Sequence, residues 1–436
     1  MNFGLFLLLN AVLLIRPEEL FPAIAGLRLY LIVIVPCLLT SLPRLVELLS
    51  PSSLRDRPVA VCVLLFFAAT LVSLCVQGRV NEAFTEFGPE FGKVILYYFL
   101  LLAVVDTPER YRAFAAALIL LIGVLTGIAL AQQYGLTQFD NITPCLQVAM
   151  DPETGESYTF PRLVSTGIFN DPNDLCLVLG LGIWCCIYCG STNSFGLVGW
   201  AFWLLPVPLY VFALLETHSR GGLMGVLAGG AAYLYSRFGG PKAFPLAIAG
   251  IAVALAAIGG RQGNIGGGGT AHERLMMWAD GLGNLFAQKT HLLTGLGVGF
   301  MVEEHGLVAH NSFVQAYVEQ GILGGGSFLA AFILGLWLTD RLGRGVPAPD
   351  WAVQARPFAF AAVAGYAMGC YSLTRNFVVP TYLTLGLASV LLDAAAPTLP
   401  EKYQVSGRWF GWLFLFGIVG LVFIKLATQV LGMAGV

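Results

Sequence analysis

Long apolar runs separated by short polar stretches make up most of the chain. Twelve or thirteen runs are long enough, or nearly long enough, to cross the ~30 Å hydrocarbon core of a bilayer. They lie at about 3–15, 27–46, 59–77, 91–105, 110–134, 173–190, 196–216, 221–236, 243–259, 321–339, 357–373, 377–395 and 409–431. Because a segment in lipid must satisfy its own backbone hydrogen bonds, each run is expected to be a helix. The pattern predicts an all-α polytopic integral membrane protein with about 12 transmembrane helices.

The polar stretches divide the chain into three parts. Residues 1–259 are expected to form a transmembrane region of about nine spans, and residues 260–320 a loop that carries short helices and part of a site. Residues 321–436 then form three or four further spans, a count that the runs between 357 and 395 leave open. Lys and Arg in the short loops favour an inside N-terminus, which places the long loops 135–172 and 260–320 outside.

Composition supports the membrane assignment and excludes some partners. Hydrophobic residues make up 57% of the 436 residues and charged residues only 11%, against about 25% charged in a soluble domain. With a net charge of −2 there is no bulk basic surface, so membrane lipids are expected as partners and nucleic acid is not. Cys185, Cys186 and Cys189 cluster, but no His or acid joins them at metal-ligand spacing. The sequence predicts neither a metal centre nor a cofactor.

The first long loop ends in the sequence Asn170-Asp171-Pro172-Asn173-Asp174. Asp at an N-cap followed by Pro at the first helical position is a strong helix start. A cap for the next span therefore accounts for Asp171 and Pro172. It does not require Asn170 or Asn173, which remain candidates for contact with a polar ligand.

A second motif, Ser219-Arg220-Gly221-Gly222, joins two apolar runs. Ser219 can cap the following helix, whose free N–H groups and positive dipole end attract anions. Arg220 adds a fork of donors that suits phosphate oxygens, and the glycines allow a bulky group to approach the backbone. The alternative is that Arg220 extends to lipid phosphates, as charged residues at span ends commonly do.

The second long loop contains a glycine-rich stretch followed by Thr270 and Glu273, which form a capping box. The box predicts a helix near 271–287 that lies at the membrane surface. Its apolar face consists of Leu275, Trp278, Leu282 and Leu285. Arg274 lies in the first turn, where a positive charge opposes the helix dipole. This local cost favours a functional role for Arg274, the alternative being a lone surface charge.

His310 is the candidate for proton transfer, since its unperturbed pKa near 6.5 suits that task. It precedes a short predicted helix on which Asn311, Gln315 and Glu319 stack four residues apart on one face. A lone histidine is more often structural, and Glu319 equally fits a partner for neighbouring protein groups. Arg375, near the end of a later apolar run, is either a third anion ligand or a charge that extends to lipid phosphates.

Together these pieces resemble the O-antigen ligase/polymerase superfamily of bacterial glycan-assembly enzymes. The many-span layout and the large late loop agree with it over most of the chain. The motifs that carry the resemblance are Ser-Arg-Gly-Gly at 219–222, the Arg274 helix leading to Gly-Leu-Gly-Val-Gly at 295–299, and His310-Asn311 followed by Glu319-Gln320-Gly321. Each motif is short, and their order and spacing give the match.

The resemblance implies a multi-pass glycosyltransferase of the bacterial inner membrane, with its active site on the periplasmic face. Such enzymes move a glycan from undecaprenyl diphosphate to an acceptor hydroxyl. Ligases use the lipid A core as acceptor, which is the assignment favoured here, and polymerases extend repeat units. The family's histidine corresponds to His310 and its two arginines to Arg220 and Arg274. Further substrate contacts, or support for these three, are expected from Ser219, Asn170, Asn173, Asn311, Glu319 and Arg375.

The expected mechanism is metal-independent and inverting. The chain has no Asp-x-Asp motif to hold a divalent metal, so Arg220 and Arg274 would stabilise the departing diphosphate. His310 would accept the proton of the acceptor hydroxyl as general base. A transporter or flippase is the alternative from another class. It would place charged groups near span centres and break helices at the midplane, whereas the candidate groups lie at span ends and in loops.

Overall fold

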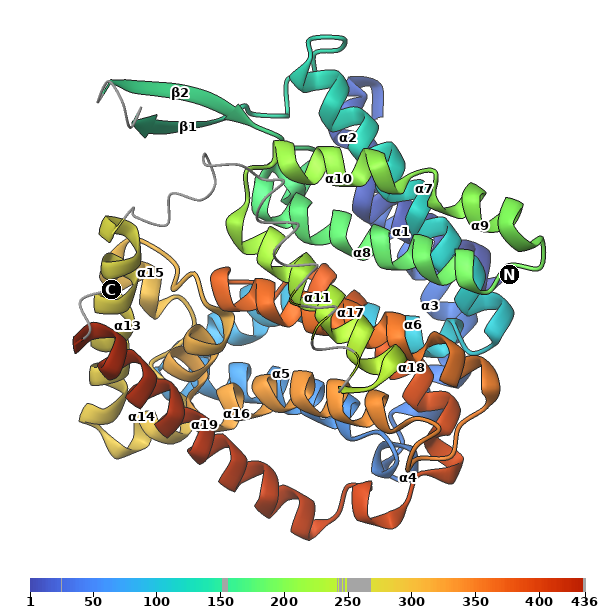
Figure 1. Ribbon diagram of the computed structural model, residues 1–436. Helices are drawn as coiled ribbons and strands as arrows, with labels where there is room; N and C mark the ends of the chain where they lie inside the picture. The colour runs from blue at the N-terminus through green and yellow to red at the C-terminus, as the bar shows by residue number, and fades with distance from the viewer. Residues whose placement is uncertain are drawn as a thin grey trace.

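The computed structural model describes residues 1–24, 26–150, 156–240 and 268–433, together with residues 242, 245 and 248 (Figure 1). Within these residues, nine helical segments are long and apolar enough to cross a membrane. They are α3 (Leu29–Leu48), α5 (Pro58–Val76), α6 (Phe87–Val104) with the π-helical turn η2 (Glu82–Glu86), α7 (Pro108–Gln133), α8 (Pro172–Ser191), α9 (Gly196–Leu204) with α10 (Val207–Glu216), α16 (Ser312–Arg341), α18 (Val379–Ala395) and α19 (Gly407–Met433).

The prediction of a helical multi-pass membrane protein is confirmed, but the count of about 12 spans is not. Helix α1 (Asn2–Ile15) is apolar but has only 14 residues. Helices α11 (Arg220–Phe238) and α17 (Asp350–Ser372) are long enough, but glycine and alanine, which are weakly hydrophobic, replace larger apolar side chains along them. The span expected at 243–259 and the glycine-rich stretch before Thr270 lie largely outside the described residues.

The remaining elements are α13, which has 20 residues, and a set of shorter helices and strands. They are α2 (Pro17–Leu20), η1 (Pro22–Ile24), α4 (Pro51–Arg55), β1 (Cys145–Met150), β2 (Ser157–Arg162), η3 (Gly167–Asn170), α13 (Gly268–Ala287), α14 (Lys289–Thr294), α15 (Phe300–His305), η4 (Ala396–Thr398) and η5 (Glu401–Tyr403). In Figure 1 the hairpin, α13, α14 and α15 gather at the left of the view, and α4 lies at the opposite end. We call the end with the hairpin and α13 the loop end.

The structure differs from the sequence-based expectation in three places. The all-α prediction did not include strands, but β1 and β2 in the first long loop form an antiparallel hairpin with Cys145 opposite Arg162. Helix α13 is the helix predicted near 271–287, but it begins at Gly268, so Thr270 lies within it and is not its N-cap. Helix α16 begins at Ser312, so the segment expected to stay in the loop until residue 320 already belongs to a span-length helix.

The predicted apolar face of α13 is buried. Its residues pack into a cluster with Met301, Tyr317 and Val318 of α15 and α16, and with Leu421 of α19. The residues of that face are Leu275, Trp278, Leu282 and Leu285. This contact fixes α13 across the loop end of α16, and the opposite face of α13 remains free to line a site.

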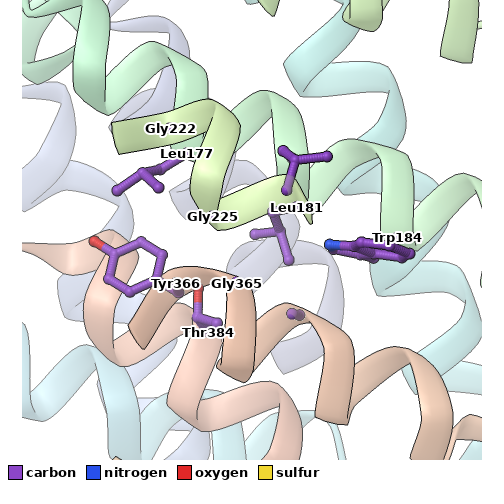
Figure 2. Close-up of a pocket in the computed structure, with 11 residues that line it drawn as sticks. Leu177, Leu181, Trp184, Gly222, Gly225, Gly365, Tyr366 and Thr384 are labelled. Atoms are coloured by element: carbon purple, nitrogen blue, oxygen red, sulfur yellow. The ribbon is translucent and has the colours of Figure 1, made fainter. Parts of the chain in front are cut away.

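Helices α11 and α17 approach each other closely along a row of small residues. A Cβ atom added at Gly225 would lie 2.8 Å from the Gly365 carbonyl oxygen, and one added at Gly229 would lie 2.9 Å from the Ala361 carbonyl oxygen. Small residues at such an interface let two membrane helices pack backbone to backbone. Figure 2 shows this crossing, with Leu177, Leu181 and Trp184 of α8 covering it. The gap left between the helices is only about 10 Å³, so it is a packing defect and not a ligand site.

This crossing predicts a stability difference between two neighbouring glycines. Gly225→Ala places a methyl group against backbone that must shift, which we expect to cost about 1–3 kcal/mol of unfolding free energy. Gly230→Ala is the matched control, because its nearest neighbour is the Trp184 ring at 4.0 Å. Thermal unfolding of both purified variants in detergent measures the difference. Equal midpoints would contradict the close approach of α11 and α17.

Candidate active site

The backbone before His310 is held by α13 and α16. The indole Nε1 of Trp278 donates a hydrogen bond to the Ala309 carbonyl oxygen at 2.6 Å. The Ala309 N–H in turn donates to Oε1 of Gln315 at 3.2 Å. Ala309 itself is fully buried. The residue that precedes His310 is therefore bonded on both its donor and its acceptor side.

Asn311 fixes the other side of His310 because it is the N-cap of α16. Its Oδ1 accepts hydrogen bonds from two backbone N–H groups of the first turn, at 3.0 and 3.2 Å. Between these fixed neighbours His310 has φ of +50°, a left-handed conformation that costs of order 1–3 kcal/mol outside glycine. Such strain persists only where the surrounding structure enforces it, and it is concentrated at functional sites.

A cavity of about 590 Å³ opens beside His310. Its volume lies within the ~300–1,000 Å³ range of small-molecule sites. The residues that line it are His272, Glu273, Arg274, Met276, Met277, Asp280, His305, Leu307 and His310. The structure thus brings together Arg274 and His310, two of the three residues that the sequence analysis singled out for chemistry.

The environment of His310 favours its neutral imidazole. Partial burial lowers its pKa below the usual 6.5, the positive charges of Arg274 and Arg375 lower it further, and Asp171 acts in the opposite direction. Among the residues that the structure describes, the imidazole has no hydrogen-bond partner. A structural histidine would be expected to have one, so this placement favours the chemical role.

Arg274 presents a guanidinium group to the same cavity. Half-burial lowers its pKa from the usual value, but an arginine remains protonated in proteins. Within the described residues no carboxylate pairs with it and no carbonyl accepts a hydrogen bond from it. A partly desolvated, unneutralised guanidinium in a cavity is a favourable site for an anion.

Arg220 does not line the cavity that Arg274 and His310 share. It is the first residue of α11 and is exposed, and it has no hydrogen bond or ion pair to the part of the chain that the structure describes. Ser219 is the N-cap, as predicted, and its Oγ accepts from the Gly222 N–H at 3.1 Å. A Cβ atom at Gly221 would lie 2.1 Å from Oγ of Ser372, so this helix start abuts the end of α17.

Arg375 is engaged by two carboxylates and is not a free anion ligand. Its Nη2 lies 2.7 Å from Oδ2 of Asp171, and its Nε pairs with Asp174, which is buried. The Arg375 backbone N–H donates to Oγ of Ser312 at 2.8 Å. This residue therefore joins the start of α8 to the start of α16, close enough to His310 to lower its pKa.

Asn173 and Asn170 have different surroundings. Oδ1 of Asn173 accepts hydrogen bonds from Ser219 Oγ at 2.7 Å and from Arg162 Nη2 at 3.1 Å, while its N–H and Nδ2 donate to Asp171. Asn173 thus connects the cap of α11 to the cap of α8. Asn170 ends η3, and its buried Oδ1 has no partner among the described residues.

Glu319 lies inside α16, away from the cavity. It is fully buried and accepts hydrogen bonds from Gln315 at 3.1 Å and Gln320 at 3.4 Å. The predicted stacking of Gln315 over Glu319 is confirmed by the first bond. The backbone N–H groups of Gly299 and Met301 also act electrostatically on this carboxylate, so Glu319 lies next to the start of α15.

The glycine motif at 295–299 has a structural explanation. Gly321 has φ of +64° and breaks the helical path of α16. The N–H groups of Leu296 and Gly297 donate to the carbonyls of Val318 and Glu319 at 2.9 and 3.1 Å. A Cβ atom at Gly295 would lie 2.2 Å from the Glu319 carbonyl oxygen, so only glycine fits there. The segment before α15 fills the break in α16.

Sequence reasoning missed several residues that build this site. The pairing of Arg375 with Asp171 and Asp174 joins positions about 200 apart in the chain, and no local pattern encodes it. The available signal was general: charged groups near membrane spans usually pair with one another. Asp280 and His305, which line the cavity, were also not singled out.

No family model and no curated protein matches this chain. Across the described residues, no group of three or more His, Cys, Asp or Glu side chains is arranged to hold a metal ion. The function must be inferred from the side chains around the cavity.

Arg375 forms ion pairs and Arg220 does not among the described residues, so we expect their replacement to have different effects on stability. Arg375→Met leaves Asp174 buried without its cation, which we expect to cost about 3–5 kcal/mol. Arg220→Met removes a charge that has no partner in the described structure, so the unfolding midpoint should stay close to that of the wild type. Thermal unfolding in detergent compares the two. A stable Arg375→Met protein would mean that the ion pairs do not hold α8 against α16.

Proposed function

We propose that the protein is a glycosyltransferase that moves a glycan from undecaprenyl diphosphate to an acceptor hydroxyl. The observation that carries this proposal is the shared cavity of Arg274 and His310, an unneutralised cation beside a neutral base. The diphosphate of the donor requires the first group, and deprotonation of the acceptor requires the second. The proposed site faces the periplasm, and the proposed acceptor is the lipid A core, as in an O-antigen ligase.

In the proposed reaction His310 accepts the proton of the acceptor hydroxyl. The acceptor oxygen forms a bond to the anomeric carbon, and the bond from that carbon to the diphosphate oxygen breaks. The electron pair of the broken bond leaves with undecaprenyl diphosphate, whose growing charge Arg274 stabilises. A preorganised cation in a partly dry site can contribute several kcal/mol to such a step. A single displacement of this kind inverts the anomeric configuration.

Arg220, at the start of α11, is proposed to bind the same diphosphate. Support comes from its position: it is exposed, lacks a counter-ion in the described structure, and follows the Ser219 cap, where N–H groups also attract phosphate. Because Arg220 does not line the cavity, its role requires that the donor head extend from the cavity towards α11. Its contribution is therefore expected to be smaller than that of Arg274.

The transporter alternative draws on one feature, the break of α16 at Gly321 beside the buried Glu319. In transporters, broken helices line a substrate path. Here the break is filled by the chain itself, through the bonds from Leu296 and Gly297. The observation favours a rigid support for the site over a path through the membrane.

His310→Ala should lower the turnover number by about 10²–10⁴, the usual contribution of a general base. The unfolding midpoint should stay near that of the wild type, because the imidazole has no partner in the described structure. The assay uses purified full-length protein in proteoliposomes with an undecaprenyl-diphosphate glycan and lipid A core. His291→Ala, on α14 and away from the cavity, is the matched control.

Wild-type transfer by His310→Ala would remove this residue from the mechanism. Movement of the donor across the bilayer without product would favour a transporter. Product that lengthens the donor glycan, without modification of lipid A core, would identify a polymerase.

The pH dependence of transfer should report on Arg274. In the wild type kcat/KM should fall on the acid side, at a pH below 6.5, because the pKa of His310 is lowered. Arg274→Gln removes a positive charge that lowers this pKa, so the acid limb should move to higher pH. Arg274→Lys retains the charge and should leave the limb in place, while losing rate because the forked donor is lost. If the acid limb lies at the same pH in all three proteins, the charge of Arg274 does not affect the pKa of His310 and the prediction is wrong.

A further inference from the structure

The cavity has a second group of polar side chains, apart from Arg274 and His310. Asp280 of α13 and His305 at the end of α15 both line it. Asp280 lies six residues after Arg274, about 9 Å further along the helix at ~1.5 Å per residue. The cavity therefore has a cationic part near Arg274 and an acid–imidazole part near Asp280.

The Asp280–His305 pair has hydrogen-bonding capacity that the described residues do not use. Nε2 of His305 lies 3.4 Å from Oδ2 of Asp280. That nitrogen is buried and has no hydrogen-bond partner within the described residues. Asp280 itself is 54% exposed and accepts a hydrogen bond from Nδ2 of Asn284 at 3.2 Å. An exposed carboxylate with free acceptor capacity thus lies beside a buried ring nitrogen that the described residues leave unsatisfied.

This chemistry fits a neutral polyol and opposes an anion. A sugar hydroxyl is both donor and acceptor, so it can donate a hydrogen bond to the exposed carboxylate of Asp280, beside which Nε2 of His305 lacks a partner among the described residues. A diphosphate would be repelled by the carboxylate of Asp280. Met276 and Leu307 add apolar surface for the carbon-bound face of a sugar ring. The two parts of the cavity therefore suit two different chemical groups.

We propose that Asp280 and His305 form the binding subsite for the acceptor glycan and hold its hydroxyl-bearing sugar next to His310. This inference rests on the proposed transferase function, and it assigns the acceptor to one part of the cavity and the donor diphosphate to the other. The residues are specificity-determining rather than catalytic, since the proton goes to His310.

Asp280→Asn and His305→Ala test the subsite in the proteoliposome assay, with donor and acceptor varied separately. Loss of one hydrogen bond involving a charged group should raise the KM for the lipid A core about tenfold or more. The KM for the undecaprenyl-diphosphate glycan should not change. Glu304→Gln is the matched control, because it removes the same charge from an exposed position of α15 that does not line the cavity.

The outcomes separate the subsite from the function. Transfer by the wild type with an unchanged acceptor KM in both variants overturns the subsite and leaves the transferase intact. A rise in the KM for the donor, with no change in the KM for the acceptor, also overturns the acceptor subsite, because it shows that Asp280 and His305 bind the donor. A fall in the unfolding midpoint with both KM values unchanged identifies a structural pair and has the same consequence. Absence of transfer by the wild type removes the transferase itself, and with it the subsite.

Discussion

The arrangement of the starts of α8 and α16 at the loop end depends on the ion pairs between Arg375 and the carboxylates of Asp171 and Asp174. One guanidinium joins the start of α8 to the segment between α17 and α18, and its backbone N–H joins Ser312 at the start of α16. Buried ion pairs contribute little net stability, but leaving one partner alone is costly. The three elements are therefore held together, because separating them would leave the buried carboxylate of Asp174 unpaired.

Further hydrogen bonds connect these ion pairs to the segments that carry Arg220 and Arg274, the two proposed diphosphate-binding residues. From Asp171 it passes through Asn173 to Ser219, the cap that precedes Arg220. On the other side, Ser312 follows Asn311, whose cap fixes the residue after His310. Trp278 then fixes Ala309 to α13, the helix that carries Arg274. Segments far apart in the sequence are thus connected by side chains that bind other protein groups. Arg220, Arg274 and His310 have no hydrogen-bond partner among the described residues and are open to the proposed substrate.

Local sequence patterns predicted what local forces determine. Helices, the Ser219 and Asp171 caps, the apolar face of α13 and the stacking of Gln315 over Glu319 all follow from residues within a few positions of one another. The joint presence of Arg274 and His310 in one cavity was expected only from the resemblance. The patterns did not predict that Arg375 forms ion pairs with two carboxylates, or that Arg220 lies outside the cavity. Nor did they predict that the glycine segment 295–299 fills a break in α16. These depend on contacts between distant segments, and single-sequence periodicity does not encode them.

The different surroundings of Arg274 and Arg220 indicate different roles for these two side chains towards the diphosphate in the proposed reaction. Arg274 is half-buried, so its charge is less screened by water and acts more strongly on a nearby oxygen. Partial burial lowers the pKa of His310 and the charge of Arg274 lowers it further, so the group proposed to stabilise the leaving diphosphate also favours the unprotonated base. Arg220 is exposed and screened, which suits initial capture of an anionic head more than stabilisation of a transition state. A donor captured at α11 and drawn into the cavity would meet the stronger field only where its bond is to break. Acceleration of the chemical step requires such a difference. A cation that bound the intact donor and the transition state equally well would raise the affinity for the donor without raising the rate.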